Sequence, residues 1–205
     1  MNRPRPPAEI FDNQAEPVFI PAHNLVEWAR ETFINDGAAL QNEDHRHLQW
    51  ANIGALWTNV PNGRQGRRVL GQCERGLPPM NKWGRARVER QFLDWFGQVP
   101  DFLLTFDAEY ANDCDDAEFM ALVEHELYHA AQERDAFGAP RFNKQTGRPV
   151  FGIRGHDVEE FVGVVRRYGA AASGVQEMVD AANAGPTIAK VHIAQACGTC
   201  QLRVA

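Results

Sequence analysis

The sequence predicts an α+β fold in which a small mixed or antiparallel sheet packs on one long helix, with further helices flanking it. Apolar runs of strand length, broken by turn residues, occupy the middle of the chain, and an uninterrupted amphipathic segment, residues 117–134, follows them. The chain has 205 residues, 44% of them hydrophobic and 23% charged. These values are typical of one globular domain that folds without a disulfide framework or a structural metal.

Composition also narrows the classes of function. The formal net charge of −6 disfavours a protein that coats nucleic acid through a basic surface. No apolar run approaches the roughly 20 residues that cross a bilayer, and Met1–Pro7 has no apolar core of a secretion signal behind it. Four scattered cysteines are too few for a secreted disulfide scaffold. We therefore expect a cytoplasmic protein without membrane contacts, for which nucleic acid is an unlikely partner; the sequence does not indicate its oligomeric state.

The first part of the chain predicts an arm, a helix and a hairpin. Residues 1–21 are rich in proline and are expected to form an extended N-terminal arm. Apolar residues at helical spacing predict a helix over residues 22–36, which ends at a glycine. The runs Ile53–Val60 and Arg68–Cys73 flank the turn Pro61-Asn62-Gly63, so we expect them to pair with each other as a hairpin.

The middle of the chain contains the clearest helix. Helical spacing predicts a helix over Arg87–Phe96, and a compact apolar run predicts a strand over residues 102–106. The segment 117–134 lacks Gly and Pro, and Asp115 followed by Glu118 resembles a capping box at its start. Its buried face should comprise Phe119, Val123, Leu127 and Ala130.

The last part of the chain is less regular. Residues 137–155 are rich in Gly, Pro and polar types and predict a loop, with a short strand at 149–153. An amphipathic pattern predicts a helix over His156–Tyr168, and a weaker pattern predicts another over Val175–Asn183. The expected domains are therefore the arm, a body over residues 22–170, and a C-terminal helix and cysteine-containing tail over residues 171–205.

The strongest chemical signal is the motif His125-Glu126-Leu127-Tyr128-His129. Residues at i and i+4 share a helix face, so both imidazoles can bind one zinc ion. Glu126 is rotated about 100° from His125, which places its carboxylate beside the metal, where a general base is needed. At this composition the motif arises by chance in roughly 2% of chains, and here it falls within a predicted helix, as the chemistry requires.

A catalytic zinc ion usually takes a third protein ligand and leaves one position open. His156 is the first candidate, and Glu160, one helical turn further on, is its rival; Glu159 is a weaker one. Such a site would activate water and polarise a substrate carbonyl, while Glu126 would take a proton and pass it to the leaving amine. The donors available for an oxyanion are Tyr128, Tyr168 and Arg154.

Two further patterns are less specific indicators of function. Cys197 and Cys200 are spaced as C-x-x-C with His192 upstream, which offers three of the four ligands of a structural zinc site; two free cysteines in a tail are the simpler interpretation. Arginines between residues 64 and 90 accompany Trp57 and Trp83, a combination that could bind nucleic acid or form a solvated rim.

The motif, the sheet that precedes it and the later segment Gly155-His156-Asp157-Val158-Glu159-Glu160-Phe161 resemble the zincin metallopeptidases. Within them, the chain is most similar to metallopeptidases encoded by phages and prophages, and more distantly to SprT-like proteases, over residues 22–170. The resemblance implies a zincin-like fold, a single catalytic Zn²⁺ and a polypeptide substrate. It also implies host cytoplasm as the location if the chain is phage-encoded.

The resemblance also assigns residues. His125 and His129 would be zinc ligands and Glu126 the catalytic base. A third histidine at the start of a later helix would be His156, although SprT-like proteins have Gly after this histidine and Phe four positions on, whereas this chain has Asp157 and Phe161. Relatives of the gluzincin type use a glutamate instead, which would select Glu160. Many SprT-like proteases end in a zinc ribbon with two C-x-x-C pairs, of which this chain has one.

The sequence thus predicts a zinc-dependent metallopeptidase. Two alternatives stay open at this level. One is a zinc-dependent hydrolase of another amide bond, which a small closed cavity would favour and an open groove along strand 102–106 would disfavour. The other is a noncatalytic protein of phage and host interaction whose metal only stabilises the fold.

Overall fold

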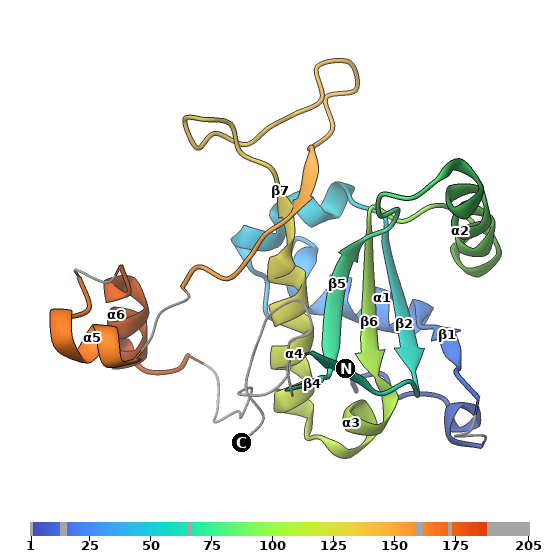
Figure 1. Ribbon diagram of the computed structural model, residues 1–205, viewed down its shortest axis with the longest axis horizontal. Helices are drawn as coiled ribbons and strands as arrows, with labels where there is room; N and C mark the ends of the chain where they lie inside the picture. The colour runs from blue at the N-terminus through green and yellow to red at the C-terminus, as the bar shows by residue number, and fades with distance from the viewer. Residues whose placement is uncertain (1, 13–15, 65–66, 159–161, 172–173, 188–205) are drawn as a thin grey trace.

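The computed structural model describes residues 2–12, 16–64, 67–158, 162–171 and 174–187. At its centre is a four-stranded mixed sheet in the order β1 (Phe19–Pro21), β2 (Ile53–Thr58), β6 (Phe102–Asp107) and β5 (Gly71–Arg75) (Figure 1). Strands β2 and β6 are parallel, and the other two pairs are antiparallel. The prediction of an α+β fold with a small mixed sheet is therefore confirmed.

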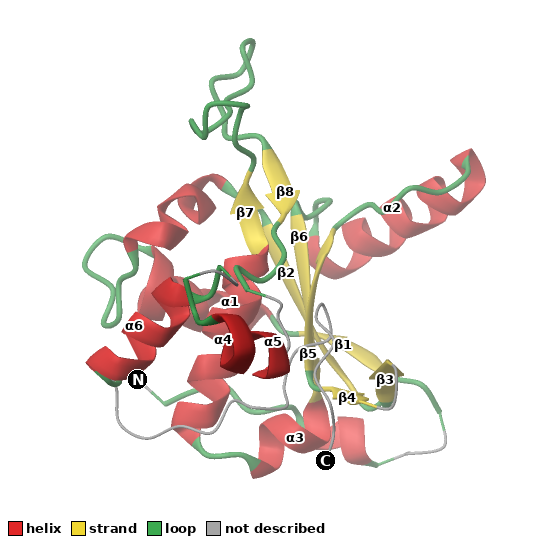
Figure 2. Ribbon diagram, turned by 60° about the vertical axis from the view of Figure 1, so that its left-hand side comes forward, coloured by secondary structure: helices red, strands yellow, loops and turns green. Residues whose placement is uncertain are grey.

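The side chains of the central strands alternate between two apolar layers, as the period of a strand requires. One layer, which includes Trp57 and Phe106, belongs to the main core and packs against helices α1 (His23–Ala29) and α4 (Asp116–His129). The other layer consists of Leu56 and Leu103, which pack with Phe92 of α2 (Lys82–Phe96). Figure 2 shows α2 on the opposite side of the sheet from α1 and α4.

The expected hairpin between Ile53–Val60 and Arg68–Cys73 is wrong in its pairing. Strand β2 pairs with β6, a partner about fifty residues away, and β5 pairs with the other edge of β6. In the sequence between β2 and β5, the strands β3 (Asn62–Arg64) and β4 (Arg67–Val69) form a short hairpin. The run Phe102–Asp107 is the most apolar and almost fully buried, so it takes the centre of the sheet, where both of its edges are hydrogen-bonded.

The segment expected as an extended arm contacts the body at several points. Ile10, in the 3-10 helix η1 (Ala8–Phe11), is fully buried, and β1 pairs with β2. The buried Arg3 donates to Asp116 Oδ1 at 2.6 Å and to the carbonyl oxygens of Ala111 and Cys114 at 2.7 and 2.6 Å. These contacts anchor the N-terminal residues to α3 (Ala108–Asp113) and to the start of α4. The boundary at residue 21 stays a prediction.

Several helix boundaries differ from the prediction. The first helix continues from α1 through a π-helical turn, η2 (Arg30–Ile34), close to its predicted end. Helix α2 begins at Lys82, five residues earlier than expected, because the Asn81 side chain accepts a hydrogen bond from Gly84 N. An unpredicted 3-10 helix, η3 (Glu43–Trp50), contains His45 and His47.

The predicted helix over residues 117–134 ends at His129. The next residues form β7 (Ala130–Gln132), which pairs with β8 (Phe151–Ile153), the short strand predicted within residues 149–153. The helix predicted over His156–Tyr168 is seen as α5 (Val162–Tyr168), and His156 lies before it in an irregular segment. Helix α6 (Gln176–Ala184) matches the last predicted helix. Among the described residues, no helix has the length and apolar character needed to cross a membrane.

Candidate metal centre

Helix α4 holds the motif residues because both its start and its apolar face are fixed. Asp115 and Glu118 form the predicted capping box, with each side chain bonded to the backbone N–H of the other residue. Phe119, Val123 and Leu127 are fully buried in the core, as predicted. This packing fixes the rotation of the helix, so that His125 is half-buried and His129 is buried on another side of it.

Three imidazoles converge at one point. His129 Nε2 lies 3.3 Å from His125 Nε2, and His156 Nε2 lies 3.1 Å from the same atom. Zinc–nitrogen bonds of 2.0–2.1 Å at tetrahedral angles place two nitrogen ligands about 3.3 Å apart, so the donor set fits one zinc ion. Within the described ranges, these three residues are the one group of His, Cys, Asp or Glu whose ligand atoms gather closely enough to hold a metal.

The hairpin β7–β8 brings His156 to the helix. Arg154 N donates to His129 O at 3.0 Å, which continues the β7–β8 pairing up to the end of α4. In return, His129 Nδ1 donates to Arg154 O at 2.6 Å. This second hydrogen bond fixes the tautomer of His129 so that Nε2 keeps its lone pair for a metal. His156 follows two residues later and therefore needs no helix to reach the site.

The surroundings favour neutral histidines, which is the form that binds metals. Burial, together with the smaller effects of the neighbouring His129 and His156, lowers the pKa of His125 from its ordinary value of 6.5 to about 4. Burial also lowers the pKa of His129, partly offset by its hydrogen bond to Arg154 O. A site of this kind is ready to bind a cation at neutral pH.

These pKa shifts predict how the stability of the metal-free protein depends on pH. Because the pKa of His125 is about 4 in the folded state and 6.5 in the unfolded state, the unfolded chain binds more protons between these values. We expect the free energy of unfolding to fall as the pH falls from about 6.5 to about 4. Above about pH 6.5, His125 should not contribute to the pH dependence of this free energy. Urea denaturation with a chelator present measures the effect. His125→Asn should show a shallower slope, and an unchanged slope would contradict the assignment.

Glu126 lies on the side of α4 that faces the sheet edge. Its side chain is fully buried and packs against Gly71 of β5, where an added Cβ would stand 3.0 Å from Glu126 Oε1. Cys73, also in β5, is buried nearby, and both burial and the charge of Glu126 raise the pKa of its thiol. The edge strand beside the candidate base is therefore β5. The strand predicted over residues 102–106 is β6, which lies between β2 and β5 and therefore forms no edge of the sheet.

The other candidates from the sequence lie in different places. Tyr128 donates its hydroxyl to Asp44 Oδ2 at 3.1 Å, beside η3. Tyr168 is exposed on α5, whereas the guanidinium of Arg154 is close enough to His129 to contribute to lowering its pKa and forms an ion pair with Asp157. Glu159 and Glu160 lie outside the described residues.

The structure tests only parts of the two less specific patterns, the cysteine-containing tail and the arginine-rich segment. The tail residues His192, Cys197 and Cys200 lie outside the described residues, and Cys73 and Cys114 are buried. Of the two tryptophans near the arginines, Trp57 is buried in the core and Trp83 is exposed. Arg68, Arg85 and Arg90 form ion pairs with carboxylates of this chain.

Sequence reasoning missed three supporting residues. Gly71 allows the close approach of Glu126, and an isolated glycine in a strand pattern is a known signal of such an approach. His47 Nε2 is 2.7 Å from Ala130 O and links η3 to the end of α4. The backbone of Arg154 orients His129, a role that no side-chain pattern indicates.

An α+β protein with three imidazoles converging at the end of a buried helix belongs to the class of candidate metalloenzymes. Over residues 26–183 the chain matches the model of a family described as "Putative phage metallopeptidase", and it belongs to that family. The similarity to metallopeptidases encoded by phages, stated from the sequence, is thereby confirmed. No curated protein and no solved structure matches the chain. Membership supports a metal-using hydrolase that acts on polypeptides.

Proposed function

We propose that the protein is a zinc-dependent peptidase with a zincin-like catalytic domain. His125, His129 and His156 would hold one Zn²⁺, and Glu126 would act as the general base. The convergence of the three Nε2 atoms within 4.8 Å of one another carries the proposal. The capped helix, the neutral histidines and the family membership support it. Its proposed location is the cytoplasm, of a host cell if the chain is phage-encoded, and the buried thiol of Cys114 agrees with such a reducing compartment.

Each residue of the proposed site has a separate role in the reaction. A bound zinc ion supplies Lewis acidity and an acidified water molecule. Glu126 is placed one helical step from His125, beside the ligands, where its carboxylate can take the proton of the attacking water and pass it to the departing amine. The hydrogen bond from His129 to Arg154 O keeps one ligand oriented throughout. Arg154, whose guanidinium is close enough to His129 to contribute to lowering its pKa, would stabilise negative charge on the substrate oxygen.

Metal analysis and a proteolysis assay test the proposal together. The purified full-length chain should bind about one zinc ion per molecule. It should hydrolyse an unfolded protein such as casein, lose this activity with a chelator, and regain it with zinc. If the protein binds no zinc on reconstitution, or if the chelator leaves its proteolytic activity unchanged, it is not a zinc peptidase. Zinc binding with a large gain in melting temperature but no hydrolysis would favour the noncatalytic alternative.

Gly71→Ala provides a separate test of the position of Glu126. The added Cβ would lie 2.9 Å from Leu122 Cδ1 and 3.0 Å from Glu126 Oε1, so the carboxylate must shift. Because a displacement of about 1 Å can cost roughly a hundredfold in rate, we expect kcat to fall tenfold to a hundredfold with the zinc content unchanged.

Gly54→Ala is the matched control for this substitution. Its Cβ would crowd Phe96 and Leu103, on the sheet face that α2 covers. It should lower the stability of the protein and leave kcat per folded molecule near the wild-type value. Equal losses of kcat in the two variants would show that Gly71 has no specific relation to Glu126.

A further inference from the structure

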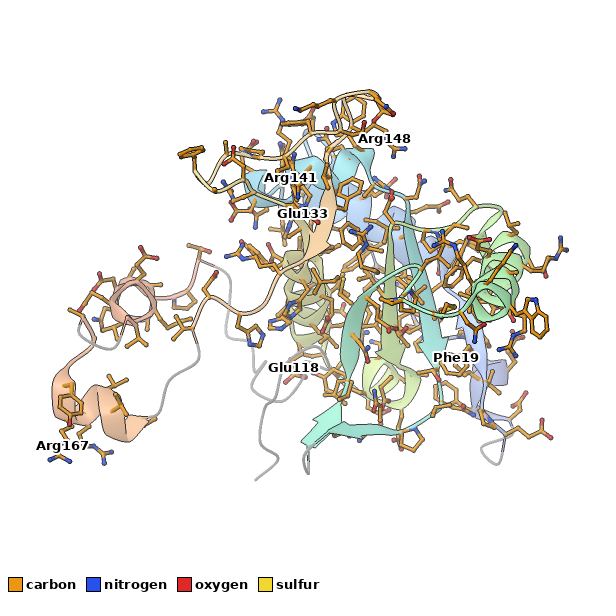
Figure 3. All side chains as sticks on the ribbon, turned by 45° about the horizontal axis from the view of Figure 1, so that its top comes forward. Phe19, Glu118, Glu133, Arg141, Arg148 and Arg167 are labelled. Carbon is orange, nitrogen blue, oxygen red and sulfur yellow. The ribbon has the colours of Figure 1, made fainter. Side chains whose placement is uncertain are left out.

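A groove of about 760 Å³ lies beside the last turn of α4, between η3 and the β7–β8 hairpin. Its floor includes Leu127 and Tyr128 of α4, and one wall includes residues 152–154 at the end of β8. The long connection between β7 and β8, marked in Figure 3 by Glu133, Arg141 and Arg148, rises beside it. The volume lies within the roughly 300–1,000 Å³ of sites that enclose a ligand, which suits a short extended segment better than a folded domain.

The groove is continuous with the elements that hold the histidines. Tyr128 is adjacent to His129 in sequence and about 100° from it around the helix. Arg154 lines the groove with its side chain, and its carbonyl oxygen accepts the hydrogen bond of His129. The groove and the metal centre therefore share α4 and Arg154, although none of the three imidazoles lines the groove.

The walls of the groove expose large apolar side chains. Trp50 is 62% exposed, Phe142 55%, Ile153 40% and Tyr128 37%, and all four line the groove. They come from four different elements or loops, so they form one surface only in the folded chain. A gathered set of exposed aromatic side chains in a concavity is typical of a site that buries apolar ligand groups.

Several charged side chains of the groove have partners of opposite charge. Arg46 pairs with Glu43, Glu133 with Arg141, and Arg154 with Asp157. Asp44 accepts a hydrogen bond from the Tyr128 hydroxyl, and Arg134 donates to Gly138 O. The lining thus carries both signs of charge without an excess that would select a charged substrate, and the proposed selectivity rests on the burial of apolar surface.

We propose that this groove binds large apolar side chains of an unfolded polypeptide on one side of the bond that is cleaved. The inference rests on the proposed peptidase function and adds its substrate class: exposed hydrophobic segments, as in unfolded or partly folded proteins. Trp50 and Phe142 are its specificity-determining residues.

Peptide binding to the full-length Glu126→Gln variant, loaded with zinc, tests the proposal without cleavage. Two fluorescent twelve-residue peptides serve as probes: one carries Phe and Leu at four central positions, and the other carries Ser there. Fluorescence anisotropy should show at least about tenfold tighter binding of the apolar peptide. Adding Trp50→Ala or Phe142→Ala should remove most of this difference, and circular dichroism checks that each variant is folded.

Trp83→Ala is the matched control, because Trp83 is an exposed tryptophan on α2, which does not line the groove. It should retain the preference for the apolar peptide. Equal affinity for the two peptides, a preference that survives both groove substitutions, or an equal loss in the control would each overturn the proposal. Cleavage of the apolar peptide by the wild-type chain is scored separately: its absence counts against the peptidase function, whereas the binding result concerns the groove.

Discussion

Replacing Glu126 with glutamine is expected to lower kcat for peptide hydrolysis by about a thousandfold and to leave one zinc ion bound per chain. The carboxamide has nearly the volume of the carboxylate, so it can occupy the same buried place against Gly71. It carries no charge at neutral pH and cannot accept the proton of the attacking water. Initial rates on casein, together with metal analysis of the same preparation, measure the two quantities.

Glu124→Gln is a control on the same helix. Glu124 lies two residues earlier and accepts a hydrogen bond from Asn42 Nδ2 at 2.9 Å, close to His45. The interaction with His45 is the main reason that the pKa of Glu124 is lowered, and this carboxylate takes no part in the proposed chemistry. Its replacement should change kcat by less than about threefold. If the two variants lose activity equally, or if Glu126→Gln remains active, Glu126 is not the general base.

The parts of the site that the sequence predicted depend on local geometry. The capping box at Asp115 and the apolar face of α4 follow from helix periodicity, which is fixed by the backbone. The same periodicity places His125 and His129 on one face, and their Nε2 atoms are 3.3 Å apart. No tertiary information is needed for these inferences, because all of these residues lie within four turns of a single helix.

The parts that failed depend on pairing between distant segments. The turn signal at Pro61-Asn62-Gly63 predicts a hairpin between the two runs that flank it. It does not indicate that β2 pairs with β6 instead, because that pairing joins segments far apart in the sequence. For the same reason, the sequence does not indicate which strand lies at the sheet edge, and it does not locate the close approach of Glu126 to Gly71. The helix predicted over residues 156–168 also begins too early, because residues 156–158 are irregular and α5 is described from Val162.

His156 illustrates how a correct residue can follow from an incorrect local structure. The sequence placed it at the start of a helix, whereas the structure has it in an irregular segment after β8. Its position depends on the β7–β8 pairing, which ends in the reciprocal hydrogen bonds between His129 and Arg154. The third candidate ligand is thus controlled by a two-stranded sheet that begins where α4 ends. Substitutions that disturb this hairpin should weaken metal binding without touching a ligand.

Alanine at any one of His125, His129 and His156 is expected to lower zinc affinity by at least about a hundredfold, more than the loss of an outer-shell partner does. Each imidazole supplies one of the three converging nitrogen atoms, and two nitrogen ligands hold zinc poorly at neutral pH. Competition with a chromophoric chelator measures the affinities. His23→Ala makes the same substitution at an exposed histidine of α1 and should bind zinc as the wild type does.

Glu160→Ala distinguishes the two candidates for the third ligand. His156 Nε2 is 3.1 Å from His125 Nε2, so we expect His156→Ala to lose zinc and Glu160→Ala to retain it. The opposite result would assign the third ligand to Glu160 and remove His156 from the site. Loss of zinc in both variants would indicate that Glu160 supports His156 from outside the ligand set. In that case His156→Ala should also abolish proteolysis, whereas Glu160→Ala should recover it when the zinc concentration is raised.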